Sequence, residues 1–447
     1  MILDKLNANG YEAYLVGGCV RDILLCREPH DWDICTSATP KQMQSCFTDT
    51  DTIETGIKHG TLTIKGSDNK YYETTTFRID GKYTDNRRPD SVEFVTDINE
   101  DLSRRDFTAN AMACGKQGNI IDPFNGQKDL KNKIIKCVGN PDKRFNEDAL
   151  RIMRAIRFAV TNHFSIDENT SKSIHKNKDL LKNISAERLN SELCKILLGL
   201  DNDNIHFMQD YRDIFAIFIP EIEKTFDFNQ YNPYHSYDVY GHILKSIISS
   251  PKDLTVRLSA LFHDIGKPDC LTREVNGRGH FYGHQFLSSE MANTIMRRLK
   301  FDNETINTVV KLVENHDNKY EPGLKSAKKM LRNFGEENTY RYLDLQLADA
   351  LAHNTAESKI LERVEKIKLQ KDFVQQVLKE KQCFSLKDLD INGNDLILIG
   401  MNPGKEIGHI LNDLLNKVID EPELNNKEIL LKISQNIIKN KNNDIDL

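Results

Sequence analysis

The sequence predicts a mixed α/β domain followed by a long helical remainder, and three observations lead to this fold class. Segments with the apolar or alternating pattern of strands are confined to the first part of the chain. They lie at residues 13–16, 32–35, 61–65, 71–78 and 92–95. Helical periodicity dominates the rest of the chain. Finally, 447 residues with 39% apolar content are too many for one compact core.

We expect four parts in the chain. An α/β head at residues 1–137 precedes a helical neck at 138–200, a helical body at 201–370 and a helical tail at 371–447. No apolar run approaches the ~18 residues that a membrane span needs, and the start lacks the zones of a signal peptide. We therefore expect a cytoplasmic protein that binds no membrane. The oligomeric state is left open.

A glycine turn near the start is the first candidate binding element. An apolar strand runs into Gly17 and Gly18, and a helical pattern that contains Arg21 follows. Backbone N–H groups at such a turn can face a phosphate, and an arginine adds a fork of donors for phosphate oxygens. Taken alone, these residues also fit an ordinary strand–helix turn.

A pair of carboxylates, Asp31 and Asp33, follows in the next strand candidate. Because side chains alternate along a strand, both carboxylates lie on one face. They repel each other unless a cation lies between them, and hard oxygen ligands suit Mg²⁺. An isolated pair also occurs at surface turns, so its meaning depends on its neighbours.

The glycine turn and the carboxylate pair begin a series of motifs in a fixed order. ETTTFR at 73–78, RRDFTANA at 104–111, DPFNG at 122–126, EDALRIMRAIRF at 147–158 and AERLNSEL at 186–193 follow them. The series resembles the class II tRNA nucleotidyltransferase and poly(A) polymerase family, whose head belongs to the DNA polymerase beta superfamily. The resemblance implies an α/β nucleotidyltransferase head followed by an all-α neck, body and tail.

The same resemblance assigns roles to residues of the head. Contacts to the nucleotide triphosphate and ribose fall on Gly18, Arg21, Arg105 and Asp106. Asp31 and Asp33 would ligate two Mg²⁺ ions, and Glu73 is a candidate third catalytic carboxylate. In such a site one metal lowers the pKa of the RNA 3′-hydroxyl, and the other stabilises the leaving pyrophosphate.

The motif at 147–158 predicts an amphipathic helix that begins at Glu147, with Asp148, Arg151, Arg154 and Arg157 on its polar face. A solvated charged face is the alternative interpretation. The resemblance makes this face the nucleotide selector. Asp148 only accepts and Arg151 only donates, so the pair admits the amino group and bare ring nitrogen of cytosine or adenine and rejects uracil and guanine. Arg154 and Arg157 are better placed for phosphate or for bracing.

Histidines in the body form a second pattern. His242, His263-Asp264 and Asp349 resemble the H…HD…D pattern of the HD phosphohydrolase superfamily. Two further histidines, His284 and His316, are candidate ligands of a second metal. Imidazole and carboxylate ligands suit a divalent transition metal such as Mn²⁺ or Ni²⁺. The domain would hydrolyse phosphoesters such as 2′,3′-cyclic ends, or it is a scaffold that retains the metal alone.

The tail motifs at 388–396 and 400–411 resemble the last helical unit of bacterial CCA-adding enzymes, which would contact the tRNA elbow. The leading hypothesis is therefore an enzyme that adds C, C and A to the tRNA 3′ end from CTP and ATP. A poly(A) polymerase or an A-adding relative is the alternative, and the basic loop at 81–89 disfavours CC-only activity. An HD phosphohydrolase with a nucleotide-sensing head is the rival from a different class.

Overall fold

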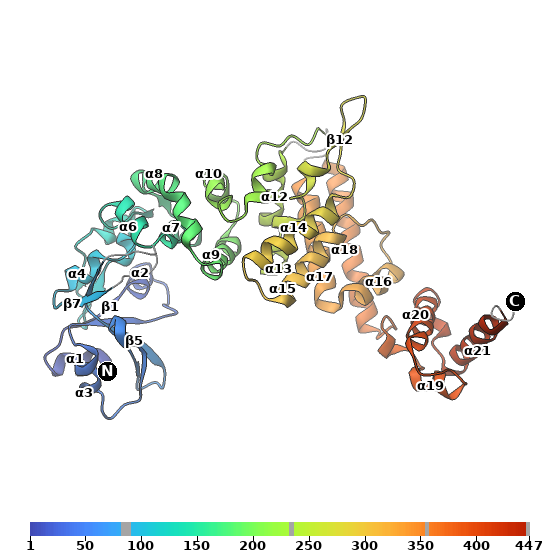
Figure 1. The fold of residues 1–447 in the computed structure, drawn as a ribbon, viewed down its shortest axis with the longest axis horizontal. Helices are drawn as coiled ribbons and strands as arrows, with labels where there is room; N and C mark the ends of the chain where they lie inside the picture. The colour runs from blue at the N-terminus through green and yellow to red at the C-terminus, as the bar shows by residue number, and fades with distance from the viewer. Residues whose placement is uncertain (82–90, 232–236, 354–356, 444–447) are drawn as a thin grey trace. The chain divides into compact units, whose positions relative to one another are not determined.

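The chain forms two compact units in a computed structural model that describes residues 1–81, 91–231, 237–353 and 357–443 (Figure 1). The first unit comprises Met1–Glu223 and Ile295–Phe301, and the second comprises Lys224–Thr294 and Asp302–Leu447. The basic loop predicted at 81–89 lies, apart from Gly81, outside the described residues. The four predicted parts remain an interpretation of the sequence within these two units.

The head is built on a mixed sheet of seven strands within the described residues, in the order β3-β4-β5-β2-β1-β8-β9. These strands are β1 (Ala13–Val16), β2 (Asp33–Thr36), β3 (Thr52–Gly56), β4 (Thr61–Lys65), β5 (Tyr71–Thr76), β8 (Ala113–Cys114) and β9 (Ile120–Ile121). Strands β2 and β5 are parallel, and the other neighbours are antiparallel. A separate antiparallel pair consists of β6 (Arg78–Asp80) and β7 (Val92–Phe94).

Side-chain alternation along the central strands builds two cores. Ile34 of β2 belongs to a core that α1 and α3 cover, whereas its neighbour Cys35 belongs to a second core that α4 covers. The head helices are α1 (Ile2–Ala8), α2 (Gly18–Leu24), α3 (Pro40–Cys46), η1 (Ile57–His59), α4 (Ile98–Ser103), η2 (Thr108–Asn110) and α5 (Gly126–Lys131). Because neighbouring side chains point to opposite faces of the sheet, an apolar core covers each face. The polar groups stand at the ends of β1 and β2.

Helices dominate the first unit after the head. They are α6 (Pro141–Glu147), α7 (Leu150–Asn162), α8 (Glu168–Asn177), η3 (Lys178–Asn183), α9 (Ala186–Gly199), α10 (His206–Asp210), α11 (Arg212–Phe215) and η4 (Pro220–Thr225). A short parallel pair, β10 (Ile134–Ile135) and β11 (Ser165–Ile166), ties the end of the head to these helices. The apolar side of α7 is fully buried, as its period predicted, with Ile152, Met153 and Ile156 each 0% exposed.

The second unit is also mainly helical. Its helices are α12 (Val239–Ser249), α13 (Leu254–Phe262), η5 (Lys267–Cys270), α14 (His284–Arg298), α15 (Asn303–Asn315), α16 (Leu324–Phe334), α17 (Glu336–Ala352), α18 (Glu357–Lys379), η6 (Leu386–Asp388), α19 (Gly393–Leu398), α20 (Lys405–Asp420), η7 (Pro422–Leu424) and α21 (Lys427–Asn443). The end of α14 clusters with the first unit. A small hairpin of β12 (Thr272–Arg273) and β13 (Gly279–His280) interrupts the all-α prediction.

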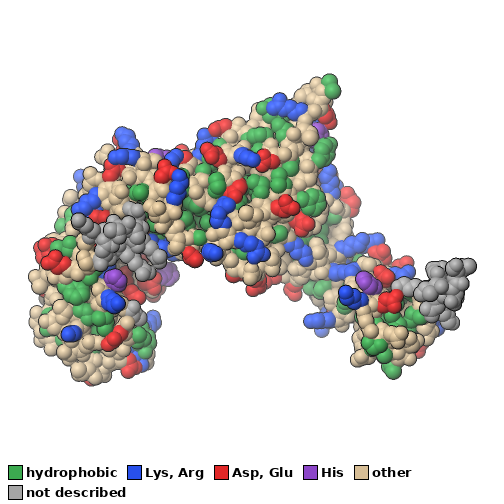
Figure 2. Space-filling model, in the orientation of Figure 1, with side chains coloured by type: hydrophobic (Ala, Val, Ile, Leu, Met, Phe, Trp, Pro, Cys, Tyr) green, Lys and Arg blue, Asp and Glu red, His purple; other side chains and the backbone are tan. Residues whose placement is uncertain are grey.

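The predicted fold class is confirmed, and the strand predictions hold with small changes. Strands β1 and β4 have the predicted bounds, β2 starts one residue later, and the segment at 71–78 divides into β5 and β6. Strand β3 was not predicted, and the two-residue strands β8 and β9 are too short to show an alternating pattern in the sequence. No helix in the described residues is long and apolar enough to cross a membrane. Figure 2 shows cationic and anionic side chains interspersed over the visible surface.

Leu62→Ala tests the head core. Leu62 is 0% exposed between the sheet and the covering helices, so its truncation should lower the free energy of unfolding by about 2–5 kcal/mol. Ile53→Ala is the matched control, because Ile53 is 47% exposed and should cost less than about 1 kcal/mol. Denaturant unfolding of the full chain measures both. Equal losses would contradict the assigned core.

Candidate functional site

The turn from β1 into α2 brings backbone close to charged side chains. Gly17 has a φ of 76°, and a Cβ at this position would lie 3.0 Å from an Arg105 guanidinium nitrogen and 3.6 Å from Asp33 Oδ2. Glycine is therefore required by both conformation and space. Gly18 begins α2, so the turn and the first turn of the helix face the same polar region.

The carboxylate pair lies beside this turn. Asp33 starts β2 and is paired with Val16, the last residue of β1. Burial raises the pKa of the Asp33 carboxyl, the Asp31 charge adds to the increase, and Arg105 opposes it. The two ionised carboxylates, Asp31 and Asp33, therefore repel each other at this site unless a cation lies between them.

A cavity of ≈ 360 Å³ connects these groups. Its lining combines the glycine turn, the carboxylates and four arginines. The residues are Gly17, Gly18, Arg21, Asp22, His30, Asp31, Asp33, Arg105, Asp106, Asn110, Arg154, Arg157 and Phe158. The structure therefore brings together eight of the head and neck residues predicted for nucleotide and metal binding.

Ion pairs fix the arginines around this cavity. Arg154 donates to Asp106 Oδ2 at 2.6 and 2.8 Å, and Arg21 donates to Asp22 and, at 2.9 Å, to Asn110 Oδ1. Burial alone would raise the pKa of the Asp106 carboxyl, but Arg154 and Arg151 lower it to about 2. Asp106 is therefore a fixed negative charge that orients Arg154 beside the glycine turn.

Arg157 is held by a second carboxylate and by an aromatic ring. Its Nε donates to Glu192 Oε2 at 2.6 Å. Its guanidinium carbon lies 3.7 Å from the centroid of the Phe158 ring, and that of Arg21 lies 5.1 Å from the same ring. The contacts hold several guanidinium groups close together, and their remaining N–H donors can bind an anionic ligand.

The predicted helix that begins at Glu147 is wrong in one respect. α6 ends at Glu147, Asp148 is extended with φ −136° and ψ 104°, and α7 begins at Leu150. The Asp148 carboxylate accepts the Leu150 backbone N–H at 3.1 Å. An aspartate side chain competes with the backbone in this way and starts a new helix. Asp148 and Arg151 are thus not on one continuous helical face.

Asp148 and Arg151 have separate partners. Arg188 of α9 donates to both Asp148 oxygens, at 2.9 and 3.2 Å. Arg151 is 9% exposed and donates to Glu147 Oε2 at 2.7 Å and to the Arg104 carbonyl at 2.9 Å. Neither residue is among those that line the cavity in the described part of the chain. Their role in base selection remains a prediction.

Glu73 also lies outside this lining. It is exposed on β5, directly before the parallel pair Ile34↔Thr74. It is therefore next to Asp33 across the ladder. Glu73 therefore stays a candidate third carboxylate, although it does not line the cavity.

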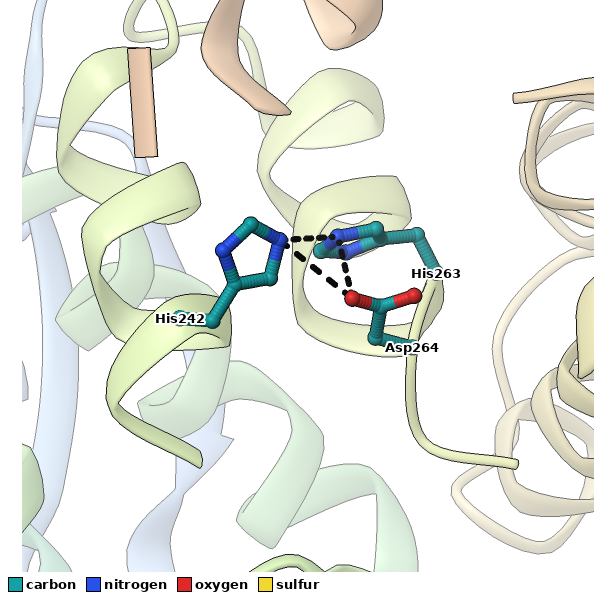
Figure 3. Close-up of side chains that lie close together, drawn as sticks. All are labelled: His242, His263 and Asp264. Atoms are coloured by element: carbon teal, nitrogen blue, oxygen red, sulfur yellow. Dashed lines mark hydrogen bonds and ion pairs between the residues drawn. The ribbon is translucent and has the colours of Figure 1, made fainter. Parts of the chain in front are cut away.

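The predicted histidine cluster of the body is assembled in the second unit. His242 comes from α12, and His263 and Asp264 directly follow α13; Figure 3 shows the two rings and the carboxylate facing one another. The two Nε2 atoms are 3.3 Å apart, and Asp264 Oδ2 lies 3.3 and 3.2 Å from them. Asp349 Oδ1 lies 3.0 Å from His242 Nε2.

The second pair of histidines faces the other oxygen of Asp264. His284 and His316 Nε2 atoms are 3.3 Å apart and lie 3.3 and 3.7 Å from Asp264 Oδ1. Both Asp264 oxygens are buried, and Oδ2 forms an ion pair with Lys267 Nζ at 2.6 Å. An aspartate between two such groups is a suitable bridge between two cations.

The backbone sets the tautomers of three of these histidines. The Nδ1 atoms of His263, His284 and His316 lie 2.7–2.8 Å from the carbonyl oxygens three residues earlier. With Nδ1–H donating there, each ring in its neutral form presents a bare Nε2 to the cluster, as metal ligands do. Burial opposes a charge on His263, but Asp264 and Asp349 raise its pKa to about 10, so a metal ion would have to displace a proton from this ring. Burial also lowers the pKa of His242 to about 4, which keeps that ring neutral. The donor set fits a divalent transition metal.

Several residues of these sites were not predicted. Asp22, His30, Asn110 and Phe158 line the head cavity, and Arg188 binds Asp148. Asn110, Phe158 and Arg188 stand inside motifs that the sequence shows, but their contacts depend on segments far apart in the chain. In the body, Lys267, His353 and Arg363 lie against the metal cluster, and Arg363 has no sequence motif that could reveal it.

The sheet, the glycine turn and the carboxylate pair define the head as a nucleotidyltransferase of the polymerase beta type. Residues 13–136 match the family model described as "Poly A polymerase head domain". Residues 163–225 match "Probable RNA and SrmB-binding site of polymerase A", and residues 284–433 match "tRNA nucleotidyltransferase domain 2".

Individual relatives identify the family. The chain is 36% identical over 431 residues to the CCA-adding enzyme of Lactococcus lactis subsp. lactis IL1403, covering 96% of this chain and 94% of that protein. It is 48% identical over 225 residues to the enzyme of L. lactis subsp. cremoris MG1363, where the match spans 48% of this chain and 56% of the relative. The chain belongs to the CCA-adding enzyme family.

A solved structure shows the same architecture over the whole chain. It is the Bacillus stearothermophilus CCA-adding enzyme in complex with CTP, with a TM-score of 0.70 and 27% sequence identity. The match covers 100% of this chain and 98% of that one. The fold is therefore shared along the full length of the chain.

Proposed function

We propose that this protein adds C, C and A to the 3′ end of tRNA from CTP and ATP without a nucleic-acid template. One observation carries the proposal: a single cavity holds the glycine turn, the carboxylate pair and the fixed arginines. Membership of the CCA-adding family and the match of residues 284–433 to a tRNA nucleotidyltransferase domain support the substrate. A poly(A) polymerase or an A-adding enzyme is the alternative.

The cavity residues suit the transfer of a nucleotidyl group. The RNA 3′-oxygen forms a bond to the α-phosphorus, the bond from that phosphorus to the bridging oxygen breaks, and pyrophosphate leaves while the hydroxyl proton is lost to solvent. The α2 start at Gly18, with Arg21, Arg154 and Arg157, would hold the triphosphate.

Asp31 and Asp33 are hard oxygen donors beside that phosphate wall, and they would hold Mg²⁺. When bound, the metal lowers the pKa of the attacking hydroxyl and neutralises charge on the phosphates. Asp106, itself fixed by Arg154, lies beside the glycine turn and is proposed to orient the ribose. The protein mainly positions reactants and balances charge.

We propose that Asp148 and Arg151 select the base. Arg188 orients Asp148, and Glu147 orients Arg151. Arg188 occupies one acceptor site at each Asp148 oxygen, the Leu150 N–H occupies a second site at Oδ1, and a carboxylate has about four acceptor sites. An amino group of cytosine or adenine can therefore still donate to Asp148. Access to Arg151 requires that its side chain rotate away from Glu147 and from the Arg104 carbonyl.

The carboxylate pair is tested with a tRNA transcript truncated before CCA and labelled CTP or ATP. The chain should add C, C and A and then stop, and Asp31→Ala should lower the rate by about 10³-fold or more, because the metal loses a ligand. Asp51→Ala is the control, since this head carboxylate is 71% exposed. Long A-tails would favour the polymerase alternative, and no incorporation would reject nucleotidyl transfer.

Arg188→Gln tests the positioning of Asp148. Loss of the two-pronged contact should raise the KM for CTP and ATP by about 3–10-fold with a smaller change in kcat. Arg188→Lys should restore part of the loss, because it keeps the charge. The control Lys195→Gln alters an exposed cation on the same helix and should behave as wild type. A uniform fall in kcat with unchanged KM would contradict a positioning role.

We infer a second candidate activity, a metal-dependent phosphohydrolase in the body, from the bridged histidine cluster. Hydrolysis would form a bond from a water oxygen to phosphorus, break the ester P–O bond and deliver the water proton to the leaving alcohol. His242, His263, Asp264 and Asp349 would hold one ion. His284 and His316 would hold the other with Asp264, and the ions would activate the water.

Metal content tests this cluster directly. After dialysis with Mn²⁺ or Ni²⁺ and removal of excess ion, elemental analysis should find up to two ions per chain, and His263→Ala should lower the number by at least one. His163→Ala is the matched control, since His163 lies with Asp201 and Asp203 in an exposed group of similar composition. A wild-type chain that retains no ion would reject the metal centre.

A further inference from the structure

Arg105 lines the head cavity, and one carboxylate holds its side chain. Its Nη2 donates to Asp101 Oδ2 at 3.2 Å, and Asp101 is its only ion-pair partner within the described residues. The Arg105 Nε is buried and has no hydrogen bond to those residues. Asp101 is therefore the polar contact that sets the direction of the Arg105 guanidinium.

The guanidinium of Arg105 lies where the glycine turn meets the carboxylate pair. A Cβ at Gly17 would be 3.0 Å from Arg105 Nη1, and the same Cβ would be 3.6 Å from Asp33 Oδ2. Burial raises the pKa of the Asp33 carboxyl, and the charge of Arg105 opposes that increase. A phosphate bound at this turn would therefore meet Arg105 and the proposed metal site together.

The two oxygens of Asp101 have different tasks. Asp101 is 0% exposed, and its Oδ1 accepts from Arg104 Nε and Nη2 at 3.0 and 2.7 Å and from the Arg78 backbone N–H at 3.3 Å. Its Oδ2 accepts from Arg105. Burial alone would raise the pKa of the Asp101 carboxyl, but Arg104 and Arg105 lower it, so the group stays ionised. One oxygen thus fastens the carboxylate in place, and the other holds Arg105.

The helix that carries Asp101 is packed against the strands of the site. Ile98 and Leu102 of α4 belong to the same core as Val16 of β1 and Cys35 of β2. The glycine turn follows β1, and the carboxylate pair stands at the start of β2. Because protein cores are close-packed and yield little, α4 keeps Asp101 at a constant place relative to both.

We propose that Asp101 is a positioning residue of the head site, which holds Arg105 at the glycine turn so that the guanidinium binds a phosphate oxygen of the incoming nucleotide. Asp101 is not among the residues that line the cavity in the described part of the chain, so it acts through Arg105. The inference rests on the proposed nucleotidyl transfer and adds a residue to that same site. Without Asp101, the guanidinium would lose its fixed direction.

Asp101→Asn removes one half of this arrangement. The oxygen of the new amide would stay at the Oδ1 position, because three N–H groups point there. The amide NH₂ would then face Arg105 Nη2, and two donors repel each other. The KM for CTP should rise by about 10-fold with a smaller change in kcat, because a hydrogen bond between charged groups is lost. Addition of labelled CTP to a tRNA transcript truncated before CCA measures both constants.

A double-mutant cycle decides whether Asp101 acts through Arg105. Calorimetry measures the binding of CTP with Mg²⁺ to the full chain without tRNA, and Arg105→Gln should weaken it by about 10-fold or more. Asp101→Asn combined with Arg105→Gln should bind no more weakly than Arg105→Gln alone, because the carboxylate then has no guanidinium to hold. Asp101→Glu keeps the charge and should recover part of the loss. Glu100→Gln alters the exposed neighbouring carboxylate on α4 and should behave as wild type.

Thermal melting checks that each variant folds, and if Asp101→Asn does not fold, Asp101→Glu takes its place in the cycle. Additive losses in the double variant, or a fall in kcat with unchanged KM, would make Asp101 a purely structural residue and overturn the inference. A CTP affinity of Asp101→Asn equal to that of wild type would overturn it as well. If the wild-type chain binds CTP but adds no nucleotide, nucleotidyl transfer is rejected, and the binding cycle still decides on Asp101.

Discussion

The ion pair between Asp106 and Arg154 is the contact on which the head site depends. It joins the loop after α4 to the middle of α7, and it fixes both groups at the cavity that contains the glycine turn. Without it, a buried carboxylate and a largely buried guanidinium would each lose their partner, which is far more costly than the loss of a surface pair. The pair therefore makes one site out of a sheet and a helix distant in sequence.

The same electrostatic logic governs both candidate metal sites. Asp31 and Asp33 place like charges together beside cationic groups, and the body cluster aims bare ring nitrogens and carboxylate oxygens at a common point. Such groups repel or stay unsatisfied until a cation binds. The difference lies in the donors: oxygen alone in the head suits Mg²⁺, and mixed nitrogen and oxygen in the body suit a transition metal.

Fixed partners also hold the two residues proposed for base selection, Asp148 and Arg151. Arg188 reaches Asp148 from α9, and Glu147 holds Arg151 at the break between α6 and α7. At the break, the Asp148 side chain accepts the Leu150 N–H just before α7, a local contact that periodicity does not reveal. Likewise, Arg363 lies 14 residues after Asp349 and contacts it only because α18 packs against α17.

The sequence by itself determined the fold class, the order of the motifs and the residue types of both sites, because strand alternation, helical period and ligand chemistry are local properties. The sequence assigned Gly18, Asp31 and Asp33 to one candidate site. It also showed the histidines in the order of a known metal-binding pattern. The tertiary structure decided which of these share a cavity, where the helix breaks at Asp148, and which oxygen of Asp264 faces which histidine pair. Those facts depend on packing between distant segments, which no local pattern encodes.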